Sequence, residues 1–172
     1  LQAPGAKEVG IETHSLSKGY NMTGWRIGSA VGNADVLQGL NKIKSNLDSK
    51  QFPAIALAAA HALLHVDGNP ETIAVYQKRR DILIEGLNSL GWKLPKSRAT
   101  LYVWAPVPPN YTSMDFAKAL LEKAGLLVIP GIGYGPAGEG YIRFSLTVSG
   151  DNNGDRVAEA MHRMKENVEI KW

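Results

Sequence analysis

The sequence predicts an α/β protein in two parts, a first part in which short strands precede helices and a smaller α+β unit that follows it. Hydrophobic residues make up 44% of the 172 residues, which is enough for a packed core. Apolar residues at helical spacing alternate with short runs of β-branched and aromatic residues. A long helix that begins at Pro70 and ends before Gly91 joins the two parts. We expect the boundary inside it, so that residues 1–85 form the first part and 86–172 the second.

In the first part we expect strands at Val9–Glu12 and Arg26–Val31. Asn33 is a suitable N-cap, because its side chain can accept a hydrogen bond from the first turn, and an apolar stripe with helical spacing follows it. Pro53 is expected to begin an Ala-rich, mostly buried helix that runs to about Val66.

In the second part the residue patterns predict strands and helices typical of a small α+β unit. The expected strands are Thr100–Val107, Leu126–Ile129 and Tyr141–Val148, and the expected helices are Ser113–Ala124, closed by Gly125, and a C-terminal helix with Val157, Met161, Met164 and Val168 on one face.

Composition narrows the classes of function. The net charge is +3 and the basic residues are scattered, so the sequence predicts neither a nucleic-acid nor a membrane partner. The absence of cysteine excludes disulfides, thiolate catalysis and cysteine-ligated metals. The longest apolar run, Ile55–Leu64, is too short to cross a bilayer. Because the chain begins at Leu1 in a loop-like stretch, we expect it to be a piece of a longer protein.

The segment from residue 15 to residue 28 carries the strongest chemical indication. It contains Lys18, the hydroxyls of Ser15 and Ser17 before it, and Arg26 eight positions after it. An amine that can form an imine, close to hydroxyl and guanidinium donors for a phosphate dianion, is what pyridoxal phosphate requires of its protein. Taken alone, the same pattern also fits a solvated loop lysine.

This segment resembles the lysine motif of the class I and II pyridoxal-phosphate aminotransferases, which have fold type I. The resemblance implies that the chain is the C-terminal part of the large α/β domain followed by the small α+β domain. It implies that Lys18 forms an imine with pyridoxal 5′-phosphate and then shuttles a proton, and that Ser15 and Arg26 bind the cofactor phosphate. The acidic partner of the pyridine nitrogen lies upstream in the family, so we expect this chain alone to be almost inactive.

A second resemblance concerns the strand of Tyr141–Ser145, which is similar to the family strand whose arginine holds the substrate α-carboxylate. The residue at that position here is Arg143. A carboxylate held by a bidentate arginine aligns the Cα–H bond of an amino acid for reaction. Read without the family, Arg143 is an ordinary exposed strand arginine. The loop of Pro130–Gly135 resembles the family's loop at the mouth of the site.

Within the family, four stretches are most similar to the LL-diaminopimelate aminotransferases: HSLSKGYNMTGWRIGSAVGN, SNLDSKQF, LYVWAPVP and GEGYIRFSLT. This implies transfer of an amino group between LL-diaminopimelate and 2-oxoglutarate by a cytoplasmic homodimer. Two alternatives remain open, an aminotransferase-like sensing domain of a transcriptional regulator and a pyridoxal-phosphate-dependent β-lyase.

Two weaker motifs point to no site. The glycines from Gly133 to Gly138 have dinucleotide-motif spacing, but Pro136 interrupts them and a strand follows, which favours a loop. His61 and His65 are four residues apart on a predicted helix, but lack a third ligand, so we expect partly buried structural histidines and no metal.

Overall fold

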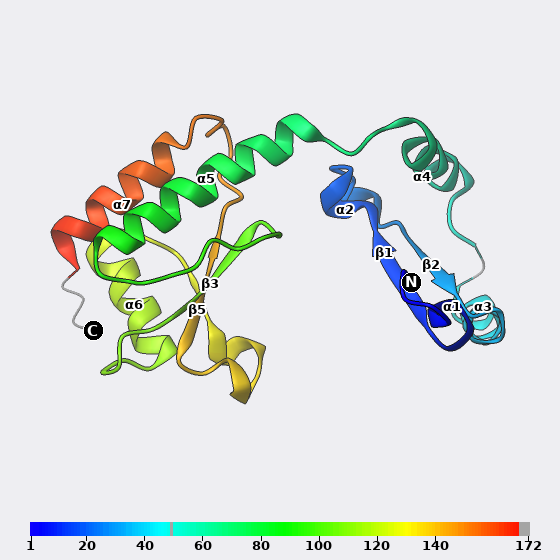
Figure 1. Cartoon of the computed structure of the whole chain (residues 1–172), viewed down its shortest axis with the longest axis horizontal. Helices are drawn as coiled ribbons and strands as arrows, with labels where there is room; N and C mark the ends of the chain where they lie inside the picture. Colours follow the sequence, from blue (N-terminus) through cyan, green and yellow to red (C-terminus); the bar gives the residue numbers. More distant parts are fainter. Residues whose placement is uncertain (49, 169–172) are drawn as a thin grey trace. The chain divides into compact units, whose positions relative to one another are not determined.

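A computed structural model describes residues 1–48 and 50–168 of the chain (Figure 1). The chain divides into two compact units, Leu1–Pro70 and Glu71–Trp172. The first unit contains α1 (Ala6–Val9), β1 (Ile11–Ser15), α2 (Leu16–Gly19), the 3₁₀ turn η1 (Thr23–Trp25), β2 (Gly28–Gly32), α3 (Ala34–Leu47) and α4 (Pro53–His65). Helix α5 (Pro70–Ser89) leads into the second, with β3 (Tyr102–Pro106), α6 (Ser113–Ala124), β4 (Ile129–Pro130), η2 (Gly131–Tyr134), η3 (Pro136–Gly138), β5 (Tyr141–Ser145) and α7 (Asp155–Asn167).

The division between the units falls at Pro70, whereas the sequence pattern places it near residue 85. The reason lies in the packing of α5. Its buried side chains are Arg79, Leu83, Ile84 and Leu87, and the three apolar ones belong to the core of the second unit. The helix therefore belongs with the unit whose core it completes, although its regular pattern contains no break that would show this.

In the first unit, β1 and β2 form an antiparallel pair in which Ile11 lies opposite Gly32 and Ser15 opposite Gly28. The first strand begins later than predicted, because Val9 ends the short helix α1. The second also begins later, because Arg26 has a left-handed backbone with φ of 52° and cannot be part of a strand.

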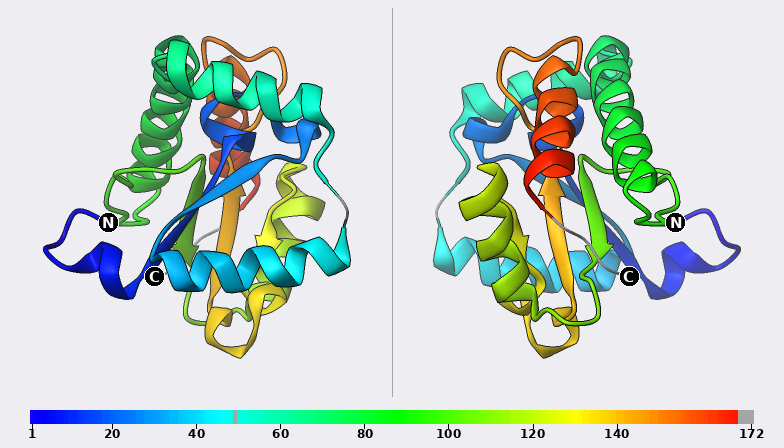
Figure 2. Two further views of the ribbon diagram at one scale, coloured as in Figure 1. Left: turned by 90° about the vertical axis from the view of Figure 1, so that its right-hand side faces the viewer. Right: turned by 90° about the vertical axis from the view of Figure 1, so that its left-hand side faces the viewer.

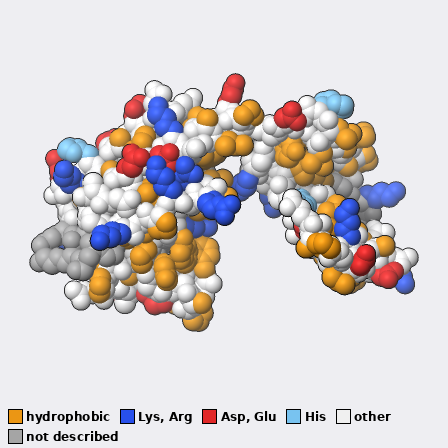
Figure 3. Space-filling model, viewed as in Figure 1, with side chains coloured by type: hydrophobic (Ala, Val, Ile, Leu, Met, Phe, Trp, Pro, Cys, Tyr) orange, Lys and Arg blue, Asp and Glu red, His pale blue; other side chains and the backbone are white. Residues whose placement is uncertain are grey.

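The predicted helix after Asn33 is confirmed, and the Asn33 side chain accepts from the Val36 amide at 2.9 Å. The predicted helix from Pro53 is also confirmed, but its expected burial is wrong. Of its residues only Ala59 is buried, and Leu57 and Leu64 are 71% and 77% exposed. Hydrophobic side chains accordingly gather on the surface around α4 (Figure 3).

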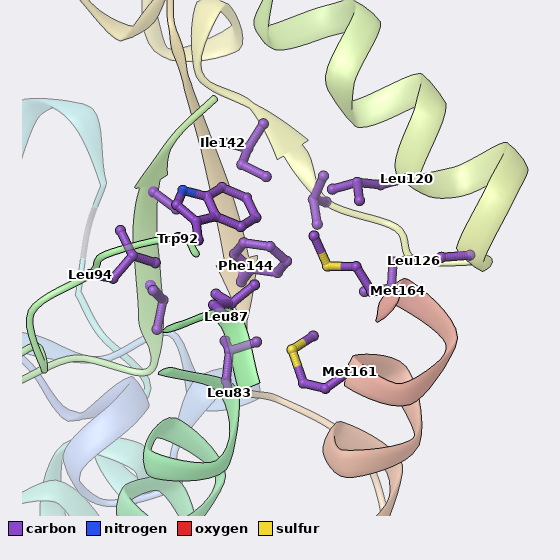
Figure 4. Packing of buried hydrophobic residues seen from close by; sticks show 14 of the residues in the cluster. Leu83, Leu87, Trp92, Leu94, Leu120, Leu126, Ile142, Phe144, Met161 and Met164 are labelled. Atoms are coloured by element: carbon purple, nitrogen blue, oxygen red, sulfur yellow. The ribbon is translucent and has the colours of Figure 1, made fainter. Parts of the chain in front are cut away.

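The second unit has a three-stranded antiparallel sheet in the order β3-β5-β4. Helices α6 and α7 cover one face of it (Figure 2). Alternate strand residues such as Ile142 and Phe144 point into the core beneath these helices (Figure 4). Trp92 lies in this core with its ring edge-on to Phe144, and its indole nitrogen donates to the carbonyl of Pro106 at 2.8 Å. The opposite face of the sheet carries Trp104 and Arg143, which lie across from each other on β3 and β5.

Helix α6 has the predicted bounds and ends at Gly125, whose φ of 64° suits a glycine C-cap. The apolar face predicted for the C-terminal helix is also confirmed, since Val157, Met161 and Met164 are buried. The predicted strand over Leu126–Ile129 is mostly wrong. Of these four residues, only Ile129 belongs to a strand, as the first residue of β4. The residues before it lie outside the sheet, and the side chains of Leu126 and Val128 are buried in the core.

Candidate functional site

The connection between β1 and β2 presents Lys18 on a single helical turn. Strand β1 ends at Ser15, whose Oγ caps α2 by accepting from the Ser17 amide at 3.2 Å. Lys18 lies in the last turn of α2 and is exposed. Among the residues that the structure describes, none forms a hydrogen bond or ion pair with its Nζ. The amine is therefore free to react with a ligand.

Arg26 lies at the far end of the same connection, just before β2, because β1 and β2 pair. Ser15 lies opposite Gly28, and the Leu16 amide donates to the carbonyl of Ile27 at 3.4 Å, so the chain closes on itself next to Arg26. This is how residues eight positions apart come to share one connection. The sequence segment thus forms one continuous surface feature of the first unit.

Two further hydrogen bonds shape this connection. The Thr23 hydroxyl donates to the carbonyl of Ser17 at 2.8 Å, and Arg26 Nη1 donates to the carbonyl of Thr23 at 3.1 Å. The sequence motif did not single out Thr23, although it lies within it. Arg26 also keeps a left-handed backbone, which costs a non-glycine residue about 1 to 2 kcal/mol. Strain of this kind is typical of functional sites.

The donors in this connection fit a phosphate ester. The Ser15 oxygen uses only a lone pair for its cap, so its proton remains available to donate. The Arg26 guanidinium is exposed, and among the described residues only its Nη1 donates a hydrogen bond. A delocalised cation with free N–H groups binds phosphate oxygens in pairs. The exposed amine of Lys18 lies in the same connection as these donors.

A small apolar cluster supports the connection from below. Leu16, Met22 and Ala59 are buried together, with Tyr20 and Ile27 packed against them. Because Ala59 belongs to α4, this helix anchors the turn that carries the lysine. The larger apolar side chains Leu57, Leu63 and Leu64 of the same helix are exposed in the described structure.

Arg143 lies in β5, the central strand of the second sheet, on the face opposite the helices. Its neighbours across the ladder are Trp104 and Ile129. It is half-buried, and its guanidinium carbon lies 4.0 Å from the centre of the Tyr102 ring and 4.9 Å from that of Tyr134. Its Nε is buried without an acceptor, and no described residue bonds to its terminal nitrogens. An anion would supply the acceptor that this half-buried cation lacks among the described residues.

The loop after β4 is held in place by a carboxylate. Glu139 accepts from the Ser113 amide at 2.7 Å and hydroxyl at 2.9 Å, and from the Gly140 amide at 2.9 Å. The Ser113 amide, followed by the other two donors, lowers the pKa of Glu139 below its usual range. At Gly131 and Gly138 the backbones approach so closely that neither position has room for a Cβ. The loop that carries Tyr134 is therefore a fixed element.

The structure thus places Ser15, Lys18 and Arg26 in one connection of the first unit, whereas Arg143 belongs to the second. Sequence reasoning did not name Tyr134, because a tyrosine in a glycine-rich loop has no pattern that distinguishes it from any other. Gly133 and Gly135 lie in 3₁₀ turns and the loop between them, in agreement with the loop favoured for this segment.

His61 and His65 are exposed, so their predicted partial burial is wrong. Their rings contact each other with centroids 4.5 Å apart on the surface of α4. No group of three or more histidine, aspartate or glutamate residues in the described part of the chain is placed to hold a metal ion. Over the same residues, no helix is both long and apolar enough to span a membrane.

Comparison with known proteins places these features in a family. The family model described as aminotransferase class I and II matches residues 4–161. An LL-diaminopimelate aminotransferase of Moorella thermoacetica is 57% identical over 166 residues, which cover 96% of this chain and 42% of that protein. LL-diaminopimelate aminotransferase 2 of Nostoc sp. is 53% identical over 167 residues, again 96% of this chain and 42% of the relative. The chain therefore spans less than half the length of these curated relatives.

Solved structures give the same result. An aminotransferase from Staphylococcus aureus has a TM-score of 0.85 and 36% identity, and covers 95% of this chain and 43% of its own. An aromatic aminotransferase from Pyrococcus horikoshii has a TM-score of 0.86 and 28% identity, with 95% and 44% covered. The chain therefore belongs to the family of class I and II aminotransferases.

Proposed function

We propose that this chain is part of a pyridoxal-phosphate-dependent aminotransferase that moves an amino group between LL-diaminopimelate and 2-oxoglutarate. The observation that carries the proposal is the connection from Ser15 to Gly28. It combines an exposed amine, which has no partner among the described residues, with the Ser15 hydroxyl and the exposed Arg26 guanidinium. The relatives named LL-diaminopimelate aminotransferase support the choice of substrate.

Bound pyridoxal phosphate supplies a carbonyl that bonds to amines and a ring that withdraws electrons from the carbon beside them. Lys18 Nζ would hold the cofactor covalently and, once a substrate amine has displaced it, would move the proton from the substrate Cα to the cofactor carbon C4′. Ser15 and Arg26 bind the phosphate and so fix the cofactor relative to Lys18. Because all three come from one connection, the cofactor and the base are positioned by the same turn.

Arg143 binds the substrate α-carboxylate in this proposal. Its guanidinium has no acceptor among the described residues. A carboxylate can therefore bind the terminal nitrogens without displacing a protein acceptor from them. The carboxylate fixes one end of the amino acid and so limits the orientations of its Cα–H bond. The same group serves the amino acid and the 2-oxo acid, since both carry this carboxylate.

We propose further that the chain works as part of a longer protein, which is a cytoplasmic homodimer acting in lysine biosynthesis. The support is the share of the relatives that the chain spans and the exposed apolar side chains of α4, which a longer protein would cover. The group that pairs with the pyridine nitrogen then comes from outside these residues.

The cofactor lysine is tested on the chain itself. The purified chain is incubated with pyridoxal phosphate, reduced with borohydride, and digested for mass spectrometry. We expect the cofactor label chiefly on Lys18, less label in Arg26→Gln, and unchanged labelling of Lys18 when the exposed Lys42 is replaced by Gln. Labelling spread evenly over the lysines would count against the site.

The substrate is tested with a chimera. This chain replaces the matching segment of the Moorella thermoacetica relative, with which it shares 57% identity. We expect the chimera to form glutamate from LL-diaminopimelate and 2-oxoglutarate. A chimera that binds the cofactor and transaminates only other amino acids would refute the proposed substrate. Release of pyruvate and ammonia would indicate the β-lyase instead.

A further inference from the structure

Two tyrosines from separate segments pack against the guanidinium of Arg143. Tyr102 comes from β3, and its ring centre lies 4.0 Å from the guanidinium carbon. Tyr134 comes from η2 and lies at 4.9 Å. Both distances are well within the range of cation–π contacts. Arg143 itself projects from the central strand, so its side chain is surrounded by elements on both sides of it.

The packing leaves the guanidinium open in one direction. Its Nε is buried and has no acceptor, which means that solvent and ligands do not reach it. The terminal nitrogens have no partner among the described residues and are absent from the buried atoms, so they face solvent. A guanidinium that is shielded at Nε and open at its end can bind a planar carboxylate, because its two terminal nitrogens donate to the two carboxylate oxygens.

Both tyrosines are themselves held. Tyr102 lies in the sheet opposite Ser145. Tyr134 lies edge-on to Trp104, with ring centres 5.7 Å apart, in the loop that Glu139 fastens to Ser113. Rings that are fixed before a ligand arrives can reduce the entropy that Arg143 loses when it binds.

We propose that Tyr102 and Tyr134 are positioning residues that hold Arg143 with its Nε shielded and its terminal nitrogens presented, so that the site selects a carboxylate bound end-on. The selectivity for a carboxylate rests on the proposed function of Arg143, whereas the positioning of its side chain does not. The rings act through Arg143 and need not touch the substrate.

The proposal is tested by NMR on the isotope-labelled 172-residue chain. The Nε–H signal of Arg143 is assigned by its loss in Arg143→Lys. We expect this proton to exchange with water about five-fold faster in Tyr102→Leu and in Tyr134→Leu. Loss of one cation–π contact should raise the population of the unshielded side-chain position by about that factor. Titration with 2-oxoglutarate should move the wild-type signal, with affinity about five-fold weaker in both Leu variants because the side chain must then be ordered on binding.

Two kinds of control separate positioning from general damage. Tyr102→Phe and Tyr134→Phe keep the rings and should retain the wild-type exchange and affinity. Tyr141→Leu removes a ring on the same face of the sheet that stacks on Trp104 at 5.6 Å and has no contact with Arg143 among the described residues. It should also leave both readouts unchanged, and backbone amide spectra show whether each variant is folded.

The outcomes distinguish the two proposals. Unchanged exchange in folded Leu variants would overturn the positioning role, whether or not 2-oxoglutarate binds. A wild-type chain that fails to bind 2-oxoglutarate while the Leu variants exchange faster would overturn the carboxylate role of Arg143 and support the positioning of its side chain. Faster exchange together with weaker binding supports both.

Discussion

Arg79 should contribute several kcal/mol to the stability of the second unit. It is 5% exposed, and its Nε and Nη1 donate to the carbonyls of Asp151 and Leu146, each at 2.8 Å. Hydrogen bonds from a charged donor contribute about 1.5 to 3 kcal/mol each, and some of this is offset by the cost of burying the charge. Arg79→Met leaves both carbonyls without that donor. Taking the lower value of about 1.5 kcal/mol for each of the two bonds, we expect Arg79→Met to lower the free energy of unfolding by about 3 kcal/mol.

Urea denaturation followed by tryptophan fluorescence measures this loss. Trp92 is a suitable reporter, because it is 1% exposed in the core of the same unit. A loss of about 3 kcal/mol lowers the midpoint by about 2 M urea for a unit of this size. Lys78→Met, at an exposed neighbouring position, should change stability by less than about 0.5 kcal/mol.

Arg79→Lys should fall between the wild type and Arg79→Met, since one ammonium group replaces a fork of two donors. If Arg79→Met unfolds at the same urea concentration as Lys78→Met, these carbonyl bonds do not stabilise the unit. The result matters for the site as well, because Leu146 directly follows β5, the strand that carries Arg143.

Three more predictions follow from the same structure. Glu139 has a pKa lowered from its ordinary value of 4.5, chiefly by the Ser113 amide, so its stabilising effect is complete above that value and is lost as the pH falls through the lower, folded pKa. Urea midpoints of Glu139→Gln should therefore lie below the wild type at neutral pH and converge with it in acid; a constant gap would contradict the assignment. Gly86→Ala should destabilise the chain by about 1 kcal/mol despite better helix propensity, because the new Cβ would come 2.5 Å from Met161 Cγ. Met161→Ala removes that Cγ and should reduce the penalty in a double-mutant cycle, and an unchanged penalty would contradict this contact. The chain alone, mixed with pyridoxal phosphate, LL-diaminopimelate and 2-oxoglutarate, should form almost no glutamate, because the partner of the pyridine nitrogen is expected outside it, and robust turnover would refute this.

The motif around Lys18 was predictable because its members are close in sequence. Ser15, Lys18 and Arg26 lie within one connection between paired strands, so local chain geometry is enough to bring them together. Capped helices were predictable for the same reason. The Asn33 cap and the Gly125 C-cap depend on backbone groups a few residues away.

Burial and strand ends were less predictable, because they depend on what packs against a segment. The apolar composition of α4 indicated a buried helix, yet Leu57 and Leu64 are exposed in this chain. Apolar residues at 126 and 128 suggested a strand, but their side chains enter the core and strand β4 begins only at Ile129. The pattern records that a residue is apolar and does not record which neighbour covers it.

By itself, the sequence determined which residues are proposed as the cofactor amine, the phosphate donors and the carboxylate arginine, since these proposals depend on residue types at short spacing. Only the tertiary structure decided the surroundings of Arg143. Helix α6 and strand β4 separate Tyr102 from Tyr134 along the chain. Both rings contact Arg143 because the strands pair in the order β3-β5-β4. Contacts between distant segments depend on that pairing, because the loss of chain entropy on closing long loops is repaid only by the packed core.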